Sequence, residues 1–157
     1  MTATAHKQDL ATTNRQFLER LFATLSHEGW GQGFLHALHD DVVFNAMGVS
    51  PIAGRYEGKQ TYITQVLERL HARIARRPQL SPIMIMTEAD MACARFQSRE
   101  GVGINGADFS MDYCWVFRIR DEKISEIWGY YDTGKMIALF DDSYAPLEGR
   151  IKPPQKH

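Results

Sequence analysis

The sequence predicts an α+β fold in which a curved, mostly antiparallel sheet forms a cone wrapped around N-terminal helices. Helical periodicity dominates the first half of the 157-residue chain, and alternating strand patterns with hairpin turns dominate the second half. Helices followed by long hairpins are typical of α+β proteins rather than of alternating βαβ units. The length suits a single domain, 1–157. We expect a core over 9–140 and flexible tails at 1–8 and 146–157.

The helical pattern has three segments before the long hairpins begin. Residues 9–27 carry apolar side chains at the three-and-four spacing of an amphipathic helix. A glycine-rich break precedes a second, short helix around Phe34. A longer helix with apolar residues from Tyr62 to Ile74 on one face stops before Pro78. The basic stretch 71–77 is expected to be the solvent face at the end of this helix.

The strand pattern has two short and four long members. The expected strands are 42–47, a segment near Arg55 and Tyr56, the hairpin 80–87 with 91–99, and the hairpin 109–119 with 123–132. A last short helix is expected at 134–140. No internal repeat or linker interrupts this order, which agrees with one domain.

The turn at 120–122 decides which side chains of the last strand share a face with the preceding strand. A two-residue turn, Asp121-Glu122, pairs Ile119 with Ile124 and places Trp128, Tyr130 and Asp132 on the face of Tyr113 and Trp115. A three-residue turn pairs Ile119 with Lys123 and sends the same set to the opposite face. We favour the two-residue turn, because Glu122 would have to adopt a positive φ in the three-residue form.

Composition limits the classes of partner. With 18 basic and 19 acidic residues the net charge is −1, so no nucleic-acid partner is expected. No apolar run approaches the ~20 residues of a membrane span. The N-terminus lacks a signal-like apolar core, so a cytoplasmic protein is expected. Cys93 and Cys114 lie in apolar strand segments and are expected to be buried, reduced thiols. No CxxC motif is present. His36 and His39, beside Asp40, have a spacing that a metal could use, but isolated surface histidines of this kind are far commoner, so no metal and no cofactor is expected.

Two stretches carry a resemblance to a known family. They are GRYEGKQTYITQVLERL, 54–70, and KISEIWGYYDT followed by GKMIALF, 123–140. With the order of elements over 9–140, they resemble the nuclear transport factor 2-like superfamily, which includes SnoaL-like polyketide cyclases and ketosteroid isomerases. The more specific signal is the joint spacing of Glu126, Trp128 and Asp132. The resemblance implies a cystatin-like cone, a hydrophobic pocket and a homodimer through the outer face of the sheet.

Asp132 is the candidate catalytic residue. The resemblance implies that it is the general acid/base of a SnoaL-like aldol closure. An aspartate before Thr133-Gly134 is also a favoured N-cap of the last helix, and both interpretations stay open. Catalysis requires the carboxyl group to be enclosed among aromatic side chains, because loss of water favours its protonated form.

The ketosteroid isomerase mechanism transfers poorly to this chain. The position of its base falls on Asn45, which cannot take up a proton at neutral pH, and the position of its oxyanion tyrosine falls on Leu21. Asn45 could instead donate a hydrogen bond to a carbonyl or enolate oxygen, or satisfy a neighbouring backbone group.

Several aromatic or apolar residues are core or interface residues by default, and a subset is expected to line a pocket for a small hydrophobic ligand. The expected lining residues are Trp30, Phe34, Met47, Tyr113, Trp115, Trp128 and Tyr130, with Asn45 as a polar member. Asp112 alternates to the face opposite Tyr113 and is expected to pair with Arg95 or Arg99.

Two functions follow. The first is a cofactor-independent isomerase, cyclase or dehydratase acting on a hydrophobic carbonyl compound, with Asp132 moving the proton. The second is a non-catalytic ligand-binding or dimerisation module of the same fold. Enclosure of Asp132 in a cavity would favour the enzyme, whereas a solvent-facing Asp132 that only caps the helix would favour the binding module.

Overall fold

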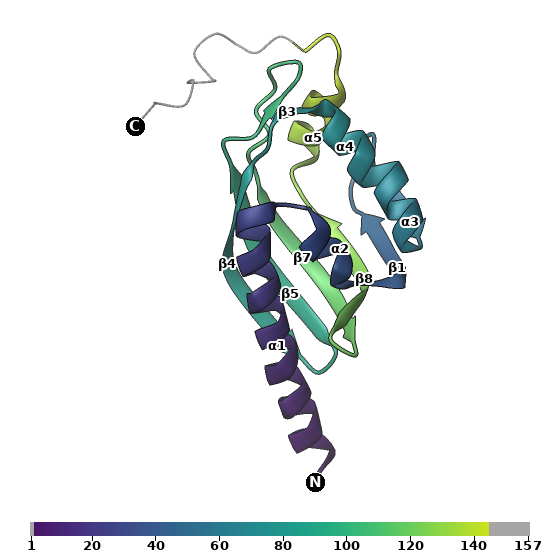
Figure 1. Cartoon of the computed structure of the whole chain (residues 1–157), viewed down its shortest axis with the longest axis vertical. Helices are drawn as coiled ribbons and strands as arrows, with labels where there is room; N and C mark the ends of the chain where they lie inside the picture. The colour runs from purple at the N-terminus through teal and green to yellow at the C-terminus, as the bar shows by residue number, and fades with distance from the viewer. Residues whose placement is uncertain (1, 145–157) are drawn as a thin grey trace.

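The computed structural model describes residues 2–144, and the expected C-terminal tail, 146–157, lies outside the described residues. The predicted α+β order is confirmed, with helices in the first half and a curved sheet in the second (Figure 1). The helices are α1 (Ala3–Glu28), α2 (Gln32–His36), α3 (Lys59–Tyr62), α4 (Glu68–Arg73) and α5 (Thr133–Phe140), and a π-helical turn, η1 (Ile63–Leu67), joins α3 to α4.

The main sheet has six strands in the order β2-β1-β8-β7-β5-β4. Only the β1–β8 pair is parallel, and the other neighbours are antiparallel. The strands are β1 (Leu38–Ala46), β2 (Gly54–Glu57), β4 (Gln79–Glu88), β5 (Met91–Arg99), β7 (Asp112–Arg120) and β8 (Lys123–Tyr130). The pattern predicted β1, β5 and β7 because each alternates between a buried and a more exposed face over most of its length.

A second, two-stranded sheet pairs β3 (Ile74–Arg76) with β6 (Val102–Gly103). We had expected residues 71–77 to continue a helix, so the prediction for this segment is wrong beyond Arg73. Its strand conformation depends on a partner about thirty residues away, and local periodicity cannot show such a partner.

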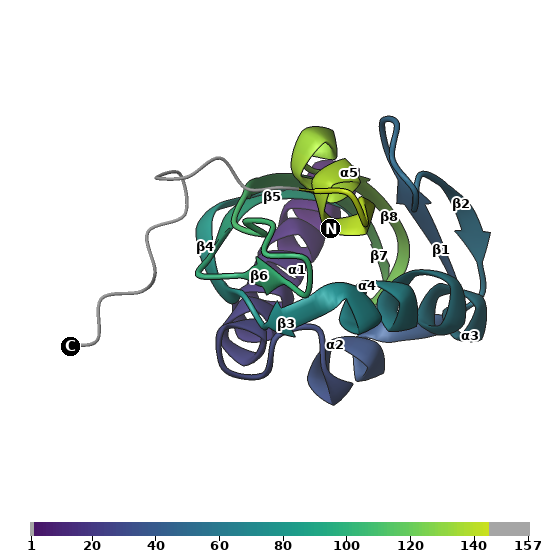
Figure 2. The same ribbon diagram turned by 90° about the horizontal axis from the view of Figure 1, so that it is seen from above.

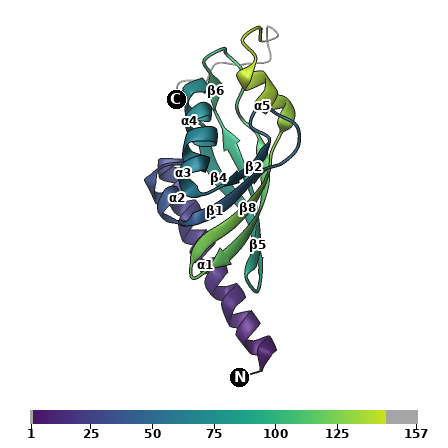
Figure 3. The same cartoon turned by 90° about the vertical axis from the view of Figure 1, so that its right-hand side faces the viewer.

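Helix α1 starts earlier than predicted. Its N-cap is Thr2, whose side chain accepts a hydrogen bond from the backbone N–H of Ala5. The expected N-terminal tail is therefore helical from Ala3, and this end of α1 projects beyond the sheet (Figures 1 and 3). The apolar stripe that includes Leu18 and Phe22 is buried, and the Phe22 ring lies 5.0 Å from the ring of Phe96.

The helices cover the inner face of the curved sheet. Seen from above, α1 lies in the hollow of the sheet, and α3 and α4 close its open side (Figure 2). The buried cluster lies in this space and includes Phe96, Trp115 and Ile127 from three neighbouring strands. Among the described residues, no helix covers the outer face of the sheet.

The β7–β8 hairpin has the favoured two-residue turn, with Ile119 opposite Ile124. Asp121 and Glu122 both have φ of 52°, the left-handed region that a type I′ hairpin turn requires. The two-residue turn is therefore correct, but the reason given for it is not, because Glu122 adopts a positive φ in this turn as well. One step further, a β-bulge changes the register, so that Arg118 pairs with Glu126 and Ser125 is the extra residue.

The bulge reverses the two faces of the rest of β8 relative to the arrangement that the turn alone would give. Beyond it, Trp128 pairs with Val116 and Tyr130 with Cys114, so both aromatic residues lie on the outer face. The predicted shared face with Tyr113 and Trp115 is wrong for these two residues. The turn was predicted correctly, but one additional residue in a strand exchanges its two faces.

Candidate functional site

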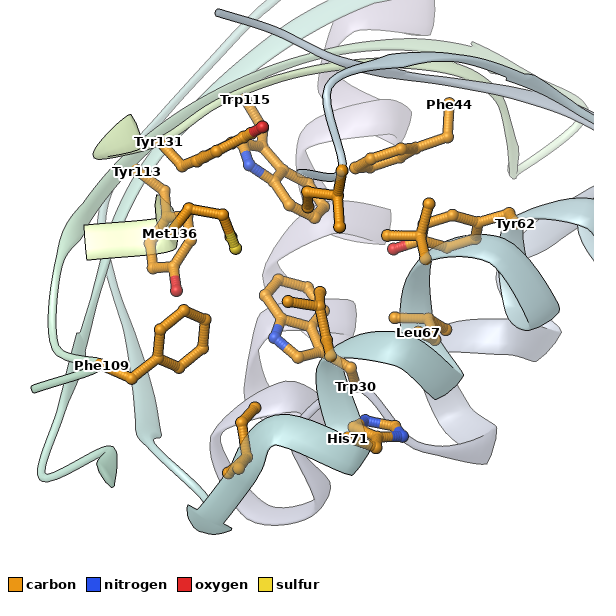
Figure 4. Close-up of a pocket in the computed structure, with 14 residues that line it drawn as sticks. Trp30, Phe44, Tyr62, Leu67, His71, Phe109, Tyr113, Trp115, Tyr131 and Met136 are labelled. Atoms are coloured by element: carbon orange, nitrogen blue, oxygen red, sulfur yellow. The ribbon is translucent and has the colours of Figure 1, made fainter. Parts of the chain in front are cut away.

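A cavity lies between the inner face of the sheet and the α3–η1–α4 segment (Figure 4). Its volume is about 40 Å³, and fourteen residues from helices, strands and loops line it. Most of its surface is apolar. The lining residues that carry the chemistry are Trp30, Tyr62, His71, Tyr113, Trp115 and Tyr131.

Aromatic stacking builds two walls of the cavity. Trp30, in the loop after α1, stacks on Trp115 of β7 with ring centroids 4.9 Å apart and planes 16° apart. Phe44 of β1 stacks on Tyr62 of α3 at 4.3 Å. The first pair joins the loop after α1 to the sheet and the second joins α3 to the sheet, so the walls are fixed by the same contacts that hold the fold together.

The indole N–H of Trp115 is the unpaired donor of this site. Trp115 is 5% exposed, and among the described residues its Nε1 atom has no hydrogen-bond partner. In Figure 4 this nitrogen lies on the side of the indole that faces Tyr131 and Met136. Gly129 of β8 leaves room for the ring, since a Cβ atom there would lie 3.2 Å from Nε1. A buried donor without an acceptor costs about 1–3 kcal/mol, so a bound acceptor would be favoured here.

Tyrosine hydroxyls supply the other polar groups of the cavity. The Tyr131 hydroxyl lies 2.8 Å from Ser50 Oγ, and the Tyr113 hydroxyl lies 3.3 Å from Ser98 Oγ. Burial raises the pKa of Tyr113 to about 12 and the pKa of Tyr62 further still. Burial also raises the pKa of Tyr131. These groups therefore keep their protons at neutral pH and can donate hydrogen bonds.

No carboxylate from the described residues lines the cavity. His71 of α4, an exposed residue at its edge, is the only lining side chain of the kind that commonly moves protons near neutral pH. Within residues 2–144, no group of three or more His, Cys, Asp or Glu side chains is placed to hold a metal ion.

Asp132 lies outside the cavity. It is exposed, and its Oδ1 accepts a hydrogen bond of 3.1 Å from the backbone N–H of Lys135, as the N-cap of α5. The enclosure that catalysis required of Asp132 is therefore not present. The reason is again the bulge, which turns Tyr131 towards the cavity and its neighbour Asp132 away from it.

Asn45 and Met47 also do not line the cavity. Asn45 Nδ2 donates to Glu126 Oε1 at 3.2 Å and to the backbone oxygen of Ile127 at 3.0 Å. It belongs to the outer face, because Phe44 and Ala46 on either side of it are buried. The structural role considered for Asn45 is the one that the geometry shows. Met47 is half-buried and follows β1, where its backbone N–H donates to the oxygen of Gly129.

The remaining expected lining residues separate into three positions. Trp30, Tyr113 and Trp115 line the cavity. Phe34 is buried behind it, with its ring 5.1 Å from Trp30. Trp128 lies on the outer face beneath the guanidinium of Arg118, and Tyr130 is 47% exposed.

Sequence reasoning missed half of the polar lining and most of the helical wall. Tyr62 was placed correctly on the inward face of its helix, but nothing in its spacing distinguishes a cavity wall from packed core. Tyr131 was missed because its face depends on the bulge. Phe44 was missed, although strand alternation implies that only one of Phe44 and its neighbour Asn45 faces inward.

The outer face carries both cysteines and several exposed apolar side chains. Cys114 is exposed and Cys93 is half-buried, so the expectation that both thiols are buried is wrong. Both alternate outward from strands whose other face forms the core. Asp112 pairs with Arg99 at 3.2 Å, one of its two expected partners.

Within the described part of the chain, no helix has the length and apolar character needed to cross a membrane.

The architecture is that of nuclear transport factor 2-like proteins with a cystatin-like fold. A nuclear transport factor 2-like protein of unknown function from Burkholderia pseudomallei aligns with a TM-score of 0.67 and 19% identity over 80% of this chain and 95% of that chain. A candidate polyketide cyclase from Pseudomonas putida aligns with a TM-score of 0.63 and 19% identity over 80% and 96%. An epoxide hydrolase from Mycobacterium tuberculosis, described as LEH-like, aligns with a TM-score of 0.61 and 19% identity over 82% of this chain and 90% of that chain. At these identities the similarity establishes the fold alone.

The SnoaL-like domain family matches residues 18–127, which is more than half of the chain. The protein therefore belongs to the SnoaL-like domain family, and the predicted resemblance is confirmed. No curated protein sequence matches the chain.

Proposed function

We propose that the protein binds a small apolar molecule that carries a hydrogen-bond-accepting oxygen, and that it holds this molecule in the cavity between the sheet and α3–η1–α4. The observation that carries the proposal is the N–H of Trp115, which has no hydrogen-bond partner in the described part of the chain and lies at a cavity whose surface is mostly apolar and aromatic. An apolar pocket with a few fixed polar groups is the usual form of a small-molecule site.

The polar groups of the cavity select for an acceptor. The Trp115 N–H can only donate, and the tyrosine hydroxyls, whose pKa values burial raises, keep a proton to donate. A ketone, aldehyde or ester oxygen can accept a hydrogen bond from the Trp115 N–H. An anionic ligand would find no Lys or Arg side chain among the lining residues, so a neutral molecule is favoured.

The volume of the cavity limits the ligand. A volume of about 40 Å³ is well below the roughly 150 Å³ of an engineered cavity that binds benzene. A ring-sized ligand therefore requires the wall to move outward. The π-helical turn η1 contributes Val66 and Leu67 to that wall, and such turns occur frequently at functional sites.

The test is a titration with cyclohexanone followed by NMR of the tryptophan indole N–H groups. The chain has three tryptophans, and Trp128 on the outer face is a control within the same spectrum. The Trp115 signal is expected to move downfield as its proton meets the ketone oxygen, while the Trp128 signal stays in place. Movement of Trp128 alone, or of no signal at millimolar ketone, would refute the proposal.

A catalytic function at the same cavity would depend on His71. It is the lining side chain suited to moving a proton, whereas Asp132 faces away from the cavity. We propose His71→Gln as the variant that separates the two functions, because His71 is exposed and its replacement disturbs no packed core. Ligand binding is expected to persist in this variant. Turnover of a carbonyl substrate that disappears with His71→Gln would instead identify an enzyme.

We also propose that a second copy of the chain covers the outer face, as the resemblance implies. Met84, Met86 and Tyr130 are 44%, 50% and 47% exposed on or beside this face, which also carries both signs of charge in Arg118 and Glu126. Such a mixed surface can be self-complementary across a twofold axis. Sedimentation velocity at micromolar concentration is expected to show a dimer for the unchanged chain and a monomer for Met86→Glu. A monomeric unchanged chain would contradict this proposal.

A further inference from the structure

Cys93 and Cys114 meet on the outer face of the sheet, with their sulfur atoms 3.5 Å apart. Cys93 on β5 pairs with Val116, and Cys114 on β7 pairs with Arg95, so the thiols are diagonal neighbours across an antiparallel ladder. Both are free, and the chain contains no other cysteine. We propose that these two thiols are an oxidation site that forms a reversible disulfide within one chain.

The geometry favours a reversible bond over a permanent one. The sulfur atoms must approach from 3.5 Å to about 2.05 Å, which needs side-chain rotation and a small strand adjustment. Diagonal neighbours in a ladder have Cα atoms about 7–8 Å apart, beyond the usual span of a disulfide. The bond is therefore strained, and strained or exposed disulfides are the ones that cellular thiols readily reduce.

The two thiols differ in access, which sets the order of the reaction. Cys114 is exposed and is the sulfur that a reagent in solution reaches first. Cys93 is half-buried in a shallow depression shared with Met86, Met91 and Val116. Burial, together with the hydrogen bond and charge of Cys114, raises the pKa of Cys93 to about 11. Formation of a mixed disulfide at Cys114 removes the hydrogen bond and the charge of its thiol, which both raise the pKa of Cys93. Cys93 therefore becomes easier to deprotonate at the step in which it is the attacking group.

With a disulfide such as oxidised glutathione as the oxidant, the electrons balance in two exchanges. The Cys114 thiolate attacks one glutathione sulfur, forms a mixed disulfide and releases one glutathione thiolate. Cys93 then loses its proton to solvent and attacks the Cys114 sulfur, which releases the second glutathione. Two protein thiols are oxidised to one disulfide, and oxidised glutathione is reduced to two molecules of glutathione.

The test uses the full, reduced chain incubated with oxidised glutathione, then alkylated and examined by intact mass and by a non-reducing gel. The expected product is a single chain lighter by two hydrogens, which dithiothreitol restores. Cys93→Ser is expected to stop at a glutathione adduct on Cys114. Cys114→Ser is expected to react much more slowly, because its remaining thiol is half-buried.

Three results would overturn the proposal. They are a stable glutathione adduct on the unchanged chain, a disulfide between chains, and loss of the two hydrogens only in denaturant. Because the homodimer proposed above would cover this face, the reaction is followed over a dilution series. Absence of the product at every dilution would likewise overturn it.

Discussion

Replacing Trp115 with phenylalanine removes the unpaired N–H and keeps an aromatic ring in the wall of the cavity. The matched ligands are cyclohexanone and methylenecyclohexane, which have similar shapes but differ in the acceptor oxygen. In the unchanged chain the ketone is expected to bind more tightly. In Trp115→Phe this preference is expected to vanish, because only the ketone loses a partner.

The magnitude follows from the state of the donor. The Trp115 N–H is buried without a partner among the described residues, so an acceptor recovers about 1–3 kcal/mol, or roughly 5- to 150-fold in Kd. Stability should change little. Loss of part of the indole costs about 1–2 kcal/mol, and removal of the unpaired donor returns a similar amount. The melting temperature is therefore expected to stay within roughly 5 °C.

Isothermal titration calorimetry of cyclohexanone and methylenecyclohexane with the unchanged chain and with Trp115→Phe measures directly how much of the preference for the ketone depends on the indole N–H. Trp128→Phe, on the outer face, is the matched control and is expected to leave both affinities unchanged. If the ketone and the hydrocarbon weaken equally in Trp115→Phe, the indole contributes shape rather than a hydrogen bond. That outcome, or an unchanged ketone affinity, would refute the reasoning.

Three further predictions concern the wall, the buried tyrosines and the hairpin turn. Leu67→Ala widens the cavity, and we expect urea unfolding to show that the free energy of unfolding falls by about 2–5 kcal/mol. Cyclohexanone is expected to bind this variant more tightly, and weaker binding would contradict the assignment of Leu67 to the cavity wall. Burial raises the pKa of Tyr113 from 10.0 to about 12 in the folded protein. Between these two pH values the unfolded chain loses the Tyr113 proton while the folded protein keeps it. The contribution of Tyr113 to the free energy of unfolding is therefore fully present below pH 10 and falls by about 1.4 kcal/mol per pH unit from pH 10 to 12. Tyr113→Phe should therefore make the free energy of unfolding depend less steeply on pH above pH 10. An unchanged slope would show that Tyr113 does not contribute to this pH dependence. Glu122→Gly places a glycine at a position with φ of 52°, which glycine adopts without steric cost, so thermal unfolding should show that the free energy of unfolding rises by about 0.5–1 kcal/mol. A fall in the free energy of unfolding would indicate that the turn is not type I′.

The elements of this fold were largely predictable because their signals are local. Alternation marked the long hairpin strands, and three-and-four spacing marked α1 and the α3–η1–α4 segment. The β3–β6 pair was not predictable, since each of these strands has only two or three residues and its partner is remote in the sequence. Local patterns describe how a segment can bury one face, and they do not identify what it is buried against.

The candidate site was only partly predictable, and Ser125 shows why. The sequence supported the two-residue turn, and the structure confirms it. A single extra residue after the turn then moved Trp128, Tyr130 and Asp132 out of the site and brought Tyr131 into it. A bulge has no reliable mark in one sequence, because any residue that tolerates a local kink can occupy it.

The sequence by itself determined the fold class and the aromatic character of the interior, because these depend on composition and on repeated local spacing. It indicated the family through the resemblance carried by residues 54–70 and 123–140. The tertiary structure alone decided which polar groups meet an enclosed space. It turned Asp132 to solvent, left the N–H of Trp115 without a partner among residues 2–144 and brought the sulfur atoms of Cys93 and Cys114 together. Such outcomes depend on strand register and on contacts between distant segments, where a shift of one residue exchanges the two faces of a strand.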